Sequence, residues 1–496
     1  MNNQEKENNL INRPPVVVVL GHVDHGKTTL LDYIRKTKIA EKEVGGITQS
    51  IGAYEVEVKG KKITFIDTPG HEAFLELRSR GAKTADLAIL VVASDEGVKP
   101  QTIESLKIIQ EAGIPYLVAF TKIDKPEANL EKSKKELAEN GVYLEKWGGN
   151  IPWVAVSSKT GEGIDELLEM IILLGELENL KGNPQKEASG FILESYLDSK
   201  RGPTAILIIT NGTLRLKDEI WAEGIFGKIK ILENFLGQPI KEATFSSPVR
   251  VVGFEQIPPV GTEFFVFKEK EELKNILKER ERKKEPKKTL GDLKSNLKVP
   301  LIIKADNIGS LEALEFLINK IGQENQWSFL VLASEVGDLT DGDIKLANPS
   351  GTIVIAFKIK KKSEAVNLLI NFPKIFVLED EIIYNIEDQI VKIVKEKFIE
   401  KPTEEIIGKL EALAIFNPSK GYQIIGGKVI EGKVINKHRF HLIRENQIIA
   451  DGKLVGLQRN KIDVNEVNEG YECGLMVDVK EEIKKGDLLE FFRKIS

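Results

Sequence analysis

A glycine-rich stretch near the start of the chain carries the residue types that hold a phosphate chain. The segment GHVDHGKTT follows an apolar strand-like run and opens a helical pattern. Gly21 and Gly26 would let backbone N–H groups point at phosphate oxygens, and the helix N-terminus adds its positive end. Lys27 would reach the β- and γ-phosphates, and Thr28 would place its hydroxyl on Mg²⁺. The other predicted phosphate-binding residues are His22, Val23, Asp24, His25, Thr29 and, from a later loop, Gly70.

A second segment, TKID at residues 121–124, chooses the base. The Asp124 carboxylate can accept both the ring N–H and the exocyclic amine of guanine. Adenine lacks that donor pair and would leave a buried carboxylate unpaired, at a cost of ~1–3 kcal/mol. The predicted guanine-binding residues are Thr121, Lys122, Asp124, Ser157, Ser158 and Lys159. TKID alone could be an ordinary charged loop, but together with the phosphate loop it favours GTP and GDP over ATP.

Two further loops predict a switch that senses the nucleotide. In DTPGH, Asp67 would hold Mg²⁺ through a water, and the Gly70 N–H would need a γ-phosphate partner. Thr48 is placed to be the second hydroxyl on Mg²⁺. His71 is the candidate catalytic residue because an imidazole can orient or deprotonate an attacking water. The alternative is that His71 is a helix cap or a surface residue, as a histidine after a turn commonly is.

The elements around these loops alternate strand and helix, which predicts a parallel sheet covered on both faces. Later segments change from short β runs to a second βα pattern and back, so the fold class is multi-domain α/β plus β. The predicted boundaries are a disordered tail at 1–12, a P-loop GTPase domain at 13–182, a β-barrel at 186–268, a charged linker or helix at 269–298, an α/β/α layer domain at 299–383, a connecting helix at 384–401 and a terminal β-barrel at 402–496.

Composition narrows the class of protein and its compartment. The chain has 496 residues, a formal net charge of −5 and one cysteine, so no internal disulfide is possible. No apolar run approaches the roughly 20 residues of a membrane-spanning helix, and the start resembles neither a secretory signal nor a transit peptide. We therefore expect a cytoplasmic protein with no membrane partner, working as a monomer. With no global basic field, any nucleic acid would have to bind a local patch.

Several motifs together resemble bacterial-type translation initiation factor 2. They are GHVDHGKTTLLD, GGITQSIGAYEV, DTPGHEAF, LIIKADNIGSLEAL and GYECG, and the likeness runs from about residue 13 to the C-terminus. The resemblance implies the same order of domains. It also implies a ribosome-stimulated GTPase that binds formylmethionyl initiator tRNA and both ribosomal subunits, promotes subunit joining and works with other initiation factors. Contacts made by the N-terminal extension of many bacterial members would be absent or reduced.

The resemblance further assigns residues that spacing alone does not. Val23 and Ile47 would form an apolar gate beside the catalytic histidine, and Arg459, Glu472 and Cys473 would lie at the initiator tRNA. The sequence departs from the family at Thr121, Ser50 and Ser158, and Gly427 stands where another cysteine is common.

The terminal β-barrel also carries a local basic surplus. Residues 420–461 hold nine Lys and Arg against three acids, which fits an RNA backbone or a solvated basic face.

Three other functions stay open at this point. An elongation or selenocysteine-tRNA carrier would share the nucleotide motifs, and a ribosome-binding scaffold could hold GTP without hydrolysing it. A kinase that uses ATP would leave TKID and the Ser157–Lys159 segment unexplained.

Overall fold

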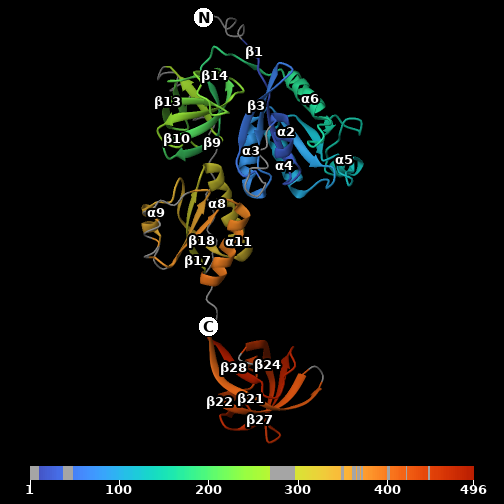
Figure 1. Ribbon diagram of the computed structural model, residues 1–496, viewed down its shortest axis with the longest axis vertical. Helices are drawn as coiled ribbons and strands as arrows, with labels where there is room; N and C mark the ends of the chain where they lie inside the picture. The colour runs from blue at the N-terminus through green and yellow to red at the C-terminus, as the bar shows by residue number, and fades with distance from the viewer. Residues whose placement is uncertain are drawn as a thin grey trace. The chain divides into compact units, whose positions relative to one another are not determined.

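The computed structural model describes residues 10–36, 48–268, 297–347, 351–359, 365, 369, 372–398, 403–419, 422–444 and 447–495. The chain divides into two compact units, Met1–Lys395 and Glu396–Ser496 (Figure 1). The first unit holds an α/β domain, a β-barrel and a smaller α/β domain. The second holds a β-barrel. The predicted fold class, multi-domain α/β plus β, is confirmed.

The first α/β domain is built on a six-stranded sheet. Its strand order is β3-β4-β2-β5-β6-β7, and only the edge strand β3 runs antiparallel to its neighbour. Parallel strands that are buried on both faces read as continuous apolar runs, as VVVVL and LAILVVA do. The strands are β2 (Val16–Gly21), β3 (Gly52–Val58), β4 (Lys61–Asp67), β5 (Leu87–Ala93), β6 (Tyr116–Thr121) and β7 (Trp153–Ala155).

Helices cover both faces of this sheet. Val17 and Val19 share a core with Leu30 and Leu167 on one face. On the other face a helix approaches so closely that a Cβ at Gly81 would lie 3.1 Å from the Val18 side chain. The helices are α2 (Lys27–Arg35), the 3₁₀ turn η2 (Glu72–Phe74), α3 (Leu75–Thr84), α4 (Pro100–Ala112), α5 (Leu130–Glu139) and α6 (Ile164–Leu177). This doubly covered layer leaves the carboxyl ends of the strands for the loops that carry the motifs.

A closed barrel follows, with strand order β10-β15-β13-β12-β16-β9. Its inward side chains form a separate apolar core that includes Leu207, Val251 and Phe264. The strands are β9 (Ser189–Asp198), β10 (Gly202–Asn211), β12 (Glu219–Ala222), β13 (Ile225–Asn234), β15 (Pro248–Phe254) and β16 (Glu263–Phe267). Two short pairs lie beside it, β11 (Thr213–Arg215) with β14 (Glu242–Thr244), and β1 (Ile11–Asn12) with β8 (Lys181–Gly182).

The third domain of this unit has a four-stranded parallel sheet, ordered β18-β17-β19-β20. Its strands are β17 (Lys298–Ala305), β18 (Ser328–Val336), β19 (Thr352–Phe357) and β20 (Ile375–Asp380). Its described helices include α8 (Ile308–Asn325), α9 (Asp341–Leu346) and α11 (Ile383–Ile393), and the π-helical turn η3 (Val394–Phe398) follows α11 across the unit boundary at Lys395.

Polar contacts join the three domains of the first unit. Arg80, on α3, donates to the Leu193 carbonyl of the barrel at 3.3 Å and to the Glu312 carboxylate of α8 at 2.6 Å. Glu194, on β9, accepts the Gly309 N–H at the start of α8. Lys320 of α8 also pairs with Glu72 of η2, so the third domain contacts the segment that follows β4.

The second unit is a barrel with its own core, which includes Leu410, Phe440 and Phe491. Pairing between β21 and β22 closes the path β21-β28-β23-β24-β27-β22. The strands are β21 (Thr403–Ser419), β22 (Tyr422–Ile435), β23 (Arg439–Arg444), β24 (Gln447–Arg459), β25 (Ile462–Asp463), β26 (Glu466–Asn468), β27 (Glu472–Val479) and β28 (Leu488–Ile495).

Two predicted boundaries differ from the structure. Residues 11–12, expected in a disordered tail, pair as β1 with β8 because Arg13 anchors this segment through a salt bridge to Asp86. The helix expected at 384–401 begins at Ile383 and ends its α-helical part at Ile393. It packs into the third domain through buried Ile386 and Ile390, so its first turns belong to that domain. Residues 399–402 and most of the charged linker lie outside the described residues.

Candidate functional site

The phosphate loop joins β2 to α2 as the sequence predicts. Gly21 has φ +150°, and a Cβ there would lie 2.5 Å from the Val91 carbonyl oxygen of β5. Gly26 caps α2 in the left-handed conformation, with φ 84°. Both conformations favour glycine, so the loop can turn sharply only with this spacing. The N-terminus of α2 then faces the space above the strand ends, where its orphan N–H groups can bind an anion.

Lys27 supplies a buried positive charge at this loop. Its Nζ donates to the carbonyl oxygens of Gly21 and His22, at 3.0 and 2.6 Å. Burial lowers the pKa of Lys27 to about 8, although the nearby Asp67 carboxylate acts in the opposite direction. The side chain therefore stays mainly protonated near pH 7. A phosphate beside it would restore part of the solvation that burial removes.

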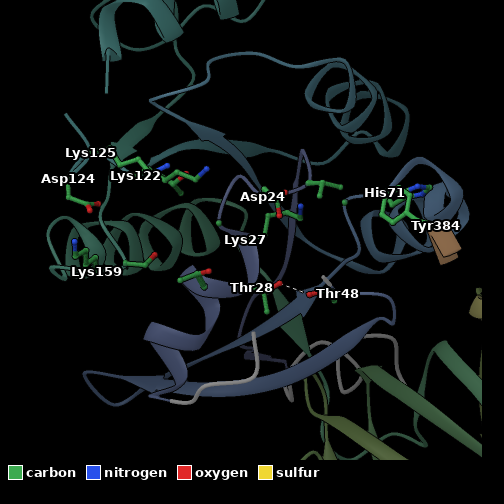
Figure 2. Close-up of a pocket in the computed structure, with 16 residues that line it drawn as sticks. Asp24, Lys27, Thr28, Thr48, His71, Lys122, Asp124, Lys125, Lys159 and Tyr384 are labelled. Atoms are coloured by element: carbon green, nitrogen blue, oxygen red, sulfur yellow. Dashed lines mark hydrogen bonds between the residues drawn. The ribbon is translucent and has the colours of Figure 1, made fainter. Parts of the chain in front are cut away.

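The two predicted hydroxyl ligands meet. Thr28 Oγ1, on α2, and Thr48 Oγ1, in the segment before β3, lie 2.6 Å apart (Figure 2). Asp67, at the end of β4, is close enough to both Lys27 and Tyr54 to affect their pKa values. These oxygen groups come from three segments, and hard cations prefer such oxygen donors. Among the described residues, no group of three or more His, Cys, Asp or Glu could hold a metal ion.

The loop after β4 presses against the phosphate loop. A Cβ at Gly70 would lie 2.6 Å from Lys27 Nζ and 2.9 Å from the Val23 nitrogen, so only glycine fits. The Gly70 carbonyl accepts a hydrogen bond from the fully buried Arg78 at 2.7 Å. Sequence reasoning missed Arg78, since an arginine inside a helix pattern gives no signal of where its guanidinium goes.

His71 satisfies both interpretations of its position. It caps η2, because its Nδ1 accepts the Ala73 N–H at 2.9 Å, and it also lines the candidate pocket. Burial lowers the pKa of His71 to about 4, with Lys320 and Arg78 acting in the same direction and Glu72 opposing them. The imidazole is therefore neutral near pH 7, and with Nδ1 accepting, its proton resides on Nε2.

At the other end of the pocket, a hydroxyl positions the Asp124 carboxylate. Ser157 is fully buried, and its Oγ donates to Asp124 Oδ1 at 2.7 Å while accepting the Lys159 N–H at 3.2 Å. This hydrogen bond holds the pKa of Asp124 below its usual range. Asp124 itself is exposed and lines this end of the pocket.

Lys122 is held beside the pocket by acidic partners. Its Nζ lies 3.1 Å from Glu96 Oε1 and 3.8 Å from Asp95 Oδ1.

One cleft of about 310 Å³ brings these groups together. Figure 2 shows Lys122, Asp124 and Lys159 at one end, Lys27, Thr28 and Thr48 in the middle, and His71 beside Tyr384 at the other end. The lining residues are Val23, Asp24, Gly26, Lys27, Thr28, Thr29, Thr48, Gly70, His71, Thr121, Lys122, Asp124, Lys125, Ser158, Lys159 and Tyr384. Lys125 and Tyr384 were not predicted. Ile47, the second gate residue, lies outside the described residues.

The second histidine of the phosphate loop points into the domain. His25 is fully buried, its Nδ1 accepts the Ala93 N–H at 3.2 Å, and burial lowers its pKa to about 4. Its carbonyl accepts the Thr121 hydroxyl at 2.6 Å. His25 and Thr121 therefore brace the loop with their side chains. The side chain of His25 is thus used inside the domain, and its predicted part in phosphate binding stays a prediction about the loop backbone.

The predicted tRNA residues of the second unit lie on the neighbouring strands β24 and β27, but they face different sides. Glu472 is exposed, whereas its neighbour Cys473 is 6% exposed and belongs to the barrel core, because successive strand residues face opposite sides. The pKa of Cys473 is raised by burial to about 11. Arg459 stacks its guanidinium 3.7 Å from the Tyr471 ring centroid. The Cys473 side chain thus lies in the barrel interior, and its place at the initiator tRNA stays a prediction from the resemblance.

Glycine stands at 427, where a cysteine is common in the family, for a steric reason. Gly427 pairs directly with Cys473 across β22 and β27, and a Cβ there would lie 2.3 Å from the Leu410 side chain.

The fold and the cleft define a class. A strand–glycine loop–helix that carries a buried lysine, two switch loops and a carboxylate at the base end is the arrangement of a P-loop GTPase domain. In the parts of the chain described by the structure, no helix is both long enough and apolar enough to span a bilayer.

Comparison with known families agrees with this class. Residues 12–176 match the Elongation factor Tu GTP binding domain, residues 187–267 match Elongation factor G domain 2, and residues 278–391 match Translation-initiation factor 2.

Three relatives, each named translation initiation factor IF-2, align over nearly the whole chain. Those of Aquifex aeolicus and of a Nitratiruptor species are 42% identical over 97% of this chain, which spans 61% and 59% of their lengths. That of Bacillus pumilus is 42% identical over 99% of this chain and 71% of its own length. The chain belongs to the translation initiation factor IF-2 family.

Proposed function

We propose that the protein is a translation initiation GTPase. It binds GTP and GDP in the cleft, hydrolyses GTP on the ribosome, stabilises formylmethionyl initiator tRNA on the small subunit and promotes subunit joining. The observation that carries the proposal is that one cleft gathers the phosphate loop, both switch segments and the guanine-side carboxylate. Other initiation factors would be partners on the same subunit.

The residues divide the work along the cleft. The N–H groups of the phosphate loop and Lys27 bind the phosphates, while Asp124 accepts the two guanine donors and Ser157 fixes its direction. Thr121 contributes indirectly by holding the loop through the His25 carbonyl. Lys122 can lay its stem along the base because its ammonium group is held by Glu96.

The oxygen groups of the site fit Mg²⁺. Thr28 and Thr48 approach each other closely enough to share one ligand, and Asp67 adds a carboxylate behind them through water. Bound there, Mg²⁺ would neutralise charge on the β- and γ-phosphates. The two hydroxyls meet only when the segment before β3 is near α2, which links the ion to the switch.

His71 is the proposed catalytic residue. Because its Nδ1 accepts the Ala73 N–H, its Nε2–H can donate to an attacking water and order it for in-line attack. With a pKa of about 4, the ring acts by orienting the water and not by taking up its proton at neutral pH. Val23 lies in the same cleft as one side of the proposed gate.

The second unit would contact the initiator tRNA. Its basic side chains at 428, 437, 439, 453 and 461 are exposed. Lys433 instead forms a salt bridge with Glu466, and Arg444 forms one with Asp487. Both acidic partners lie outside residues 420–461, the segment with the basic surplus. The usable surplus is therefore smaller than the sequence count, but it still favours a phosphate backbone.

GTP turnover, measured with and without ribosomes, tests the proposal directly. The measurement is repeated with initiator tRNA in formylated and unformylated forms and with an elongator aminoacyl-tRNA. We expect strong ribosome stimulation and a preference for the formylated initiator. Equal binding of the elongator tRNA would instead support an elongation-type carrier. GTP binding with no turnover on ribosomes would support a scaffold.

A further inference from the structure

The start of α11 contacts two loops of the first domain, the one that carries Thr48 and the one that carries His71. Gln49, one residue after Thr48, is 4% exposed. Its Nε2 donates to the Glu381 carbonyl at 2.8 Å, and its Oε1 accepts the Ile383 N–H at 3.0 Å. The next residue, Tyr384, lies against His71 in edge-to-face geometry, with ring centroids 4.3 Å apart and planes at 77°. Residues 381–384, at the start of α11, thus contact both switch loops.

His71 is held from several sides by these contacts. Its Nδ1 is occupied by the Ala73 N–H, and Phe74 flanks it at a centroid distance of 6.2 Å. His71 itself is 7% exposed, whereas Tyr384 is 40% exposed, so the tyrosine covers the imidazole from the solvent side. Figure 2 shows the two rings side by side at the end of the cleft. The orientation of His71 therefore depends on a residue of another domain.

We propose that Tyr384 is a positioning residue that restrains His71, and that full hydrolytic activity requires the first turn of α11 to release it. The inference rests on the proposed function, because a restraint on His71 matters only if His71 acts on GTP. The contact works as a brake: it keeps the imidazole in its resting orientation until the third domain shifts relative to the switch loops.

Ion pairs add to the contacts between the third domain and the loop that carries His71. Lys320, on α8, pairs with Glu72, the residue after His71, and lies 3.9 Å from Glu387 on α11. The third domain therefore holds the His71 loop through two helices. If α8 and α11 move together, the contact between His71 and Tyr384 and the ion pair between Lys320 and Glu72 are lost at the same time. The restraint then has two states, closed and released.

Single-turnover GTP hydrolysis without ribosomes tests the restraint. We expect Tyr384→Ala to raise this rate roughly two- to tenfold, the change that loss of one aromatic contact makes in a two-state equilibrium. Tyr384→Phe keeps the ring and should behave like the parent protein. Tyr384→Leu keeps an apolar side chain that packs α11 but removes the aromatic ring, and it should raise the rate as Tyr384→Ala does. Tyr143→Ala, at an exposed tyrosine elsewhere in the first domain, is the matched control.

The protonation of His71 gives a second readout that folding alone would not move. The groups that act on the imidazole are Glu72, Arg78 and Lys320, Tyr384 packs against it, and burial dominates its low pKa. Uncovering the ring should raise the pKa of His71 toward the ordinary value. The chain has five histidines, so side-chain NMR can follow each titration. A higher midpoint in Tyr384→Ala, and an unchanged one in Tyr384→Phe, is expected.

The results separate this inference from the proposed function. In a His71→Ala background, Tyr384→Ala should add no increase in rate, and an increase there would overturn the restraint. A lower rate in Tyr384→Ala would also overturn it, since the tyrosine would then support catalysis. If no GTP is hydrolysed even on ribosomes, the proposed function fails, while the NMR midpoints still decide whether Tyr384 covers His71.

Discussion

The nucleotide cleft and the surface of the terminal β-barrel were predicted from the same sequence, yet they are built differently. In the cleft, groups from the phosphate loop, the switch segments and the guanine-side loops meet in one space of about 310 Å³, and hydrogen bonds hold several of them in place. In the barrel, Arg459 stacks on Tyr471 while Cys473 points into the core. The cleft is an assembled site, and the barrel offers a charged surface.

The difference teaches how much a residue's type and spacing can specify. Phosphate binding needs backbone N–H groups in one local turn, so the motif contains most of its own geometry. Contact with an RNA backbone needs only positive charge on a surface, and many arrangements satisfy it. Single substitutions should therefore have large effects in the cleft and small ones on the barrel.

The largest expected effect is in the cleft, at His71. His71→Ala should lower ribosome-stimulated GTP hydrolysis by about 10²- to 10⁴-fold, the usual contribution of one positioned catalytic group. GDP affinity should stay nearly constant, because His71 lies at the end of the cleft away from Asp124 (Figure 2). Rapid-quench kinetics at saturating ribosomes measures the rate, with Arg459→Ala as the barrel control. Hydrolysis that stays within threefold of the parent would refute the assigned mechanism.

A smaller effect is expected at the base end of the cleft. Asp124→Ala should abolish the preference for GDP over inosine diphosphate, which lacks the exocyclic amine. The lost hydrogen bonds amount to about 1–3 kcal/mol, or roughly five- to 150-fold in GDP affinity. Calorimetric titration with both nucleotides gives the ratio, and Asp165→Ala removes a carboxylate from the surface of α6 as a control. A preference that survives in Asp124→Ala would place guanine recognition elsewhere.

The sequence predicted the elements of the cleft well because each depends on local chemistry. Buried parallel strands read as apolar runs, and Gly21 and Gly26 marked the turn that only they can make. Thr28, Thr48 and Asp124 were placed correctly in the cleft or at its edge. Their proposed roles in binding remain predictions until nucleotide binding is measured.

What could not be predicted depends on contacts between distant segments. Arg78 reaches the Gly70 carbonyl from inside a helix, and Tyr384 reaches His71 from another domain, so no spacing in the sequence reveals either. Residue 473 faces inward because of strand register, which a one-residue shift would reverse. The charge surplus of the barrel was overestimated because its salt-bridge partners lie outside the counted segment.

The pH dependence of nucleotide binding should report the charge of Lys27 in the cleft. Lys27 is charged below its pKa of about 8 and loses that charge as the pH rises through this value. An anion prefers the charged form, so GDP affinity should fall roughly three- to fourfold between pH 7 and 8.5, a range above the second pKa of the GDP phosphate. Lys27→Gln should bind weakly with a flat profile over that range. A parent profile equally flat would show that Lys27 does not interact with the phosphates.

The smallest expected effect is on the terminal barrel, where Lys453 and Arg439 lie opposite each other on β24 and β23 and are both exposed. Like charges in such a pair repel each other, and a phosphate between them would relieve the repulsion. Lys453→Gln should weaken initiator tRNA binding about two- to threefold and reduce the slope of log affinity against log salt by ~0.7–0.9, the loss of one phosphate contact. Lys433→Gln is the matched control, because Lys433 is already paired with Glu466. If both variants bind tRNA with the same salt slope as the parent, the RNA surface lies on another face of the barrel. The contrast between the assembled cleft and the basic surface would then apply to that other face.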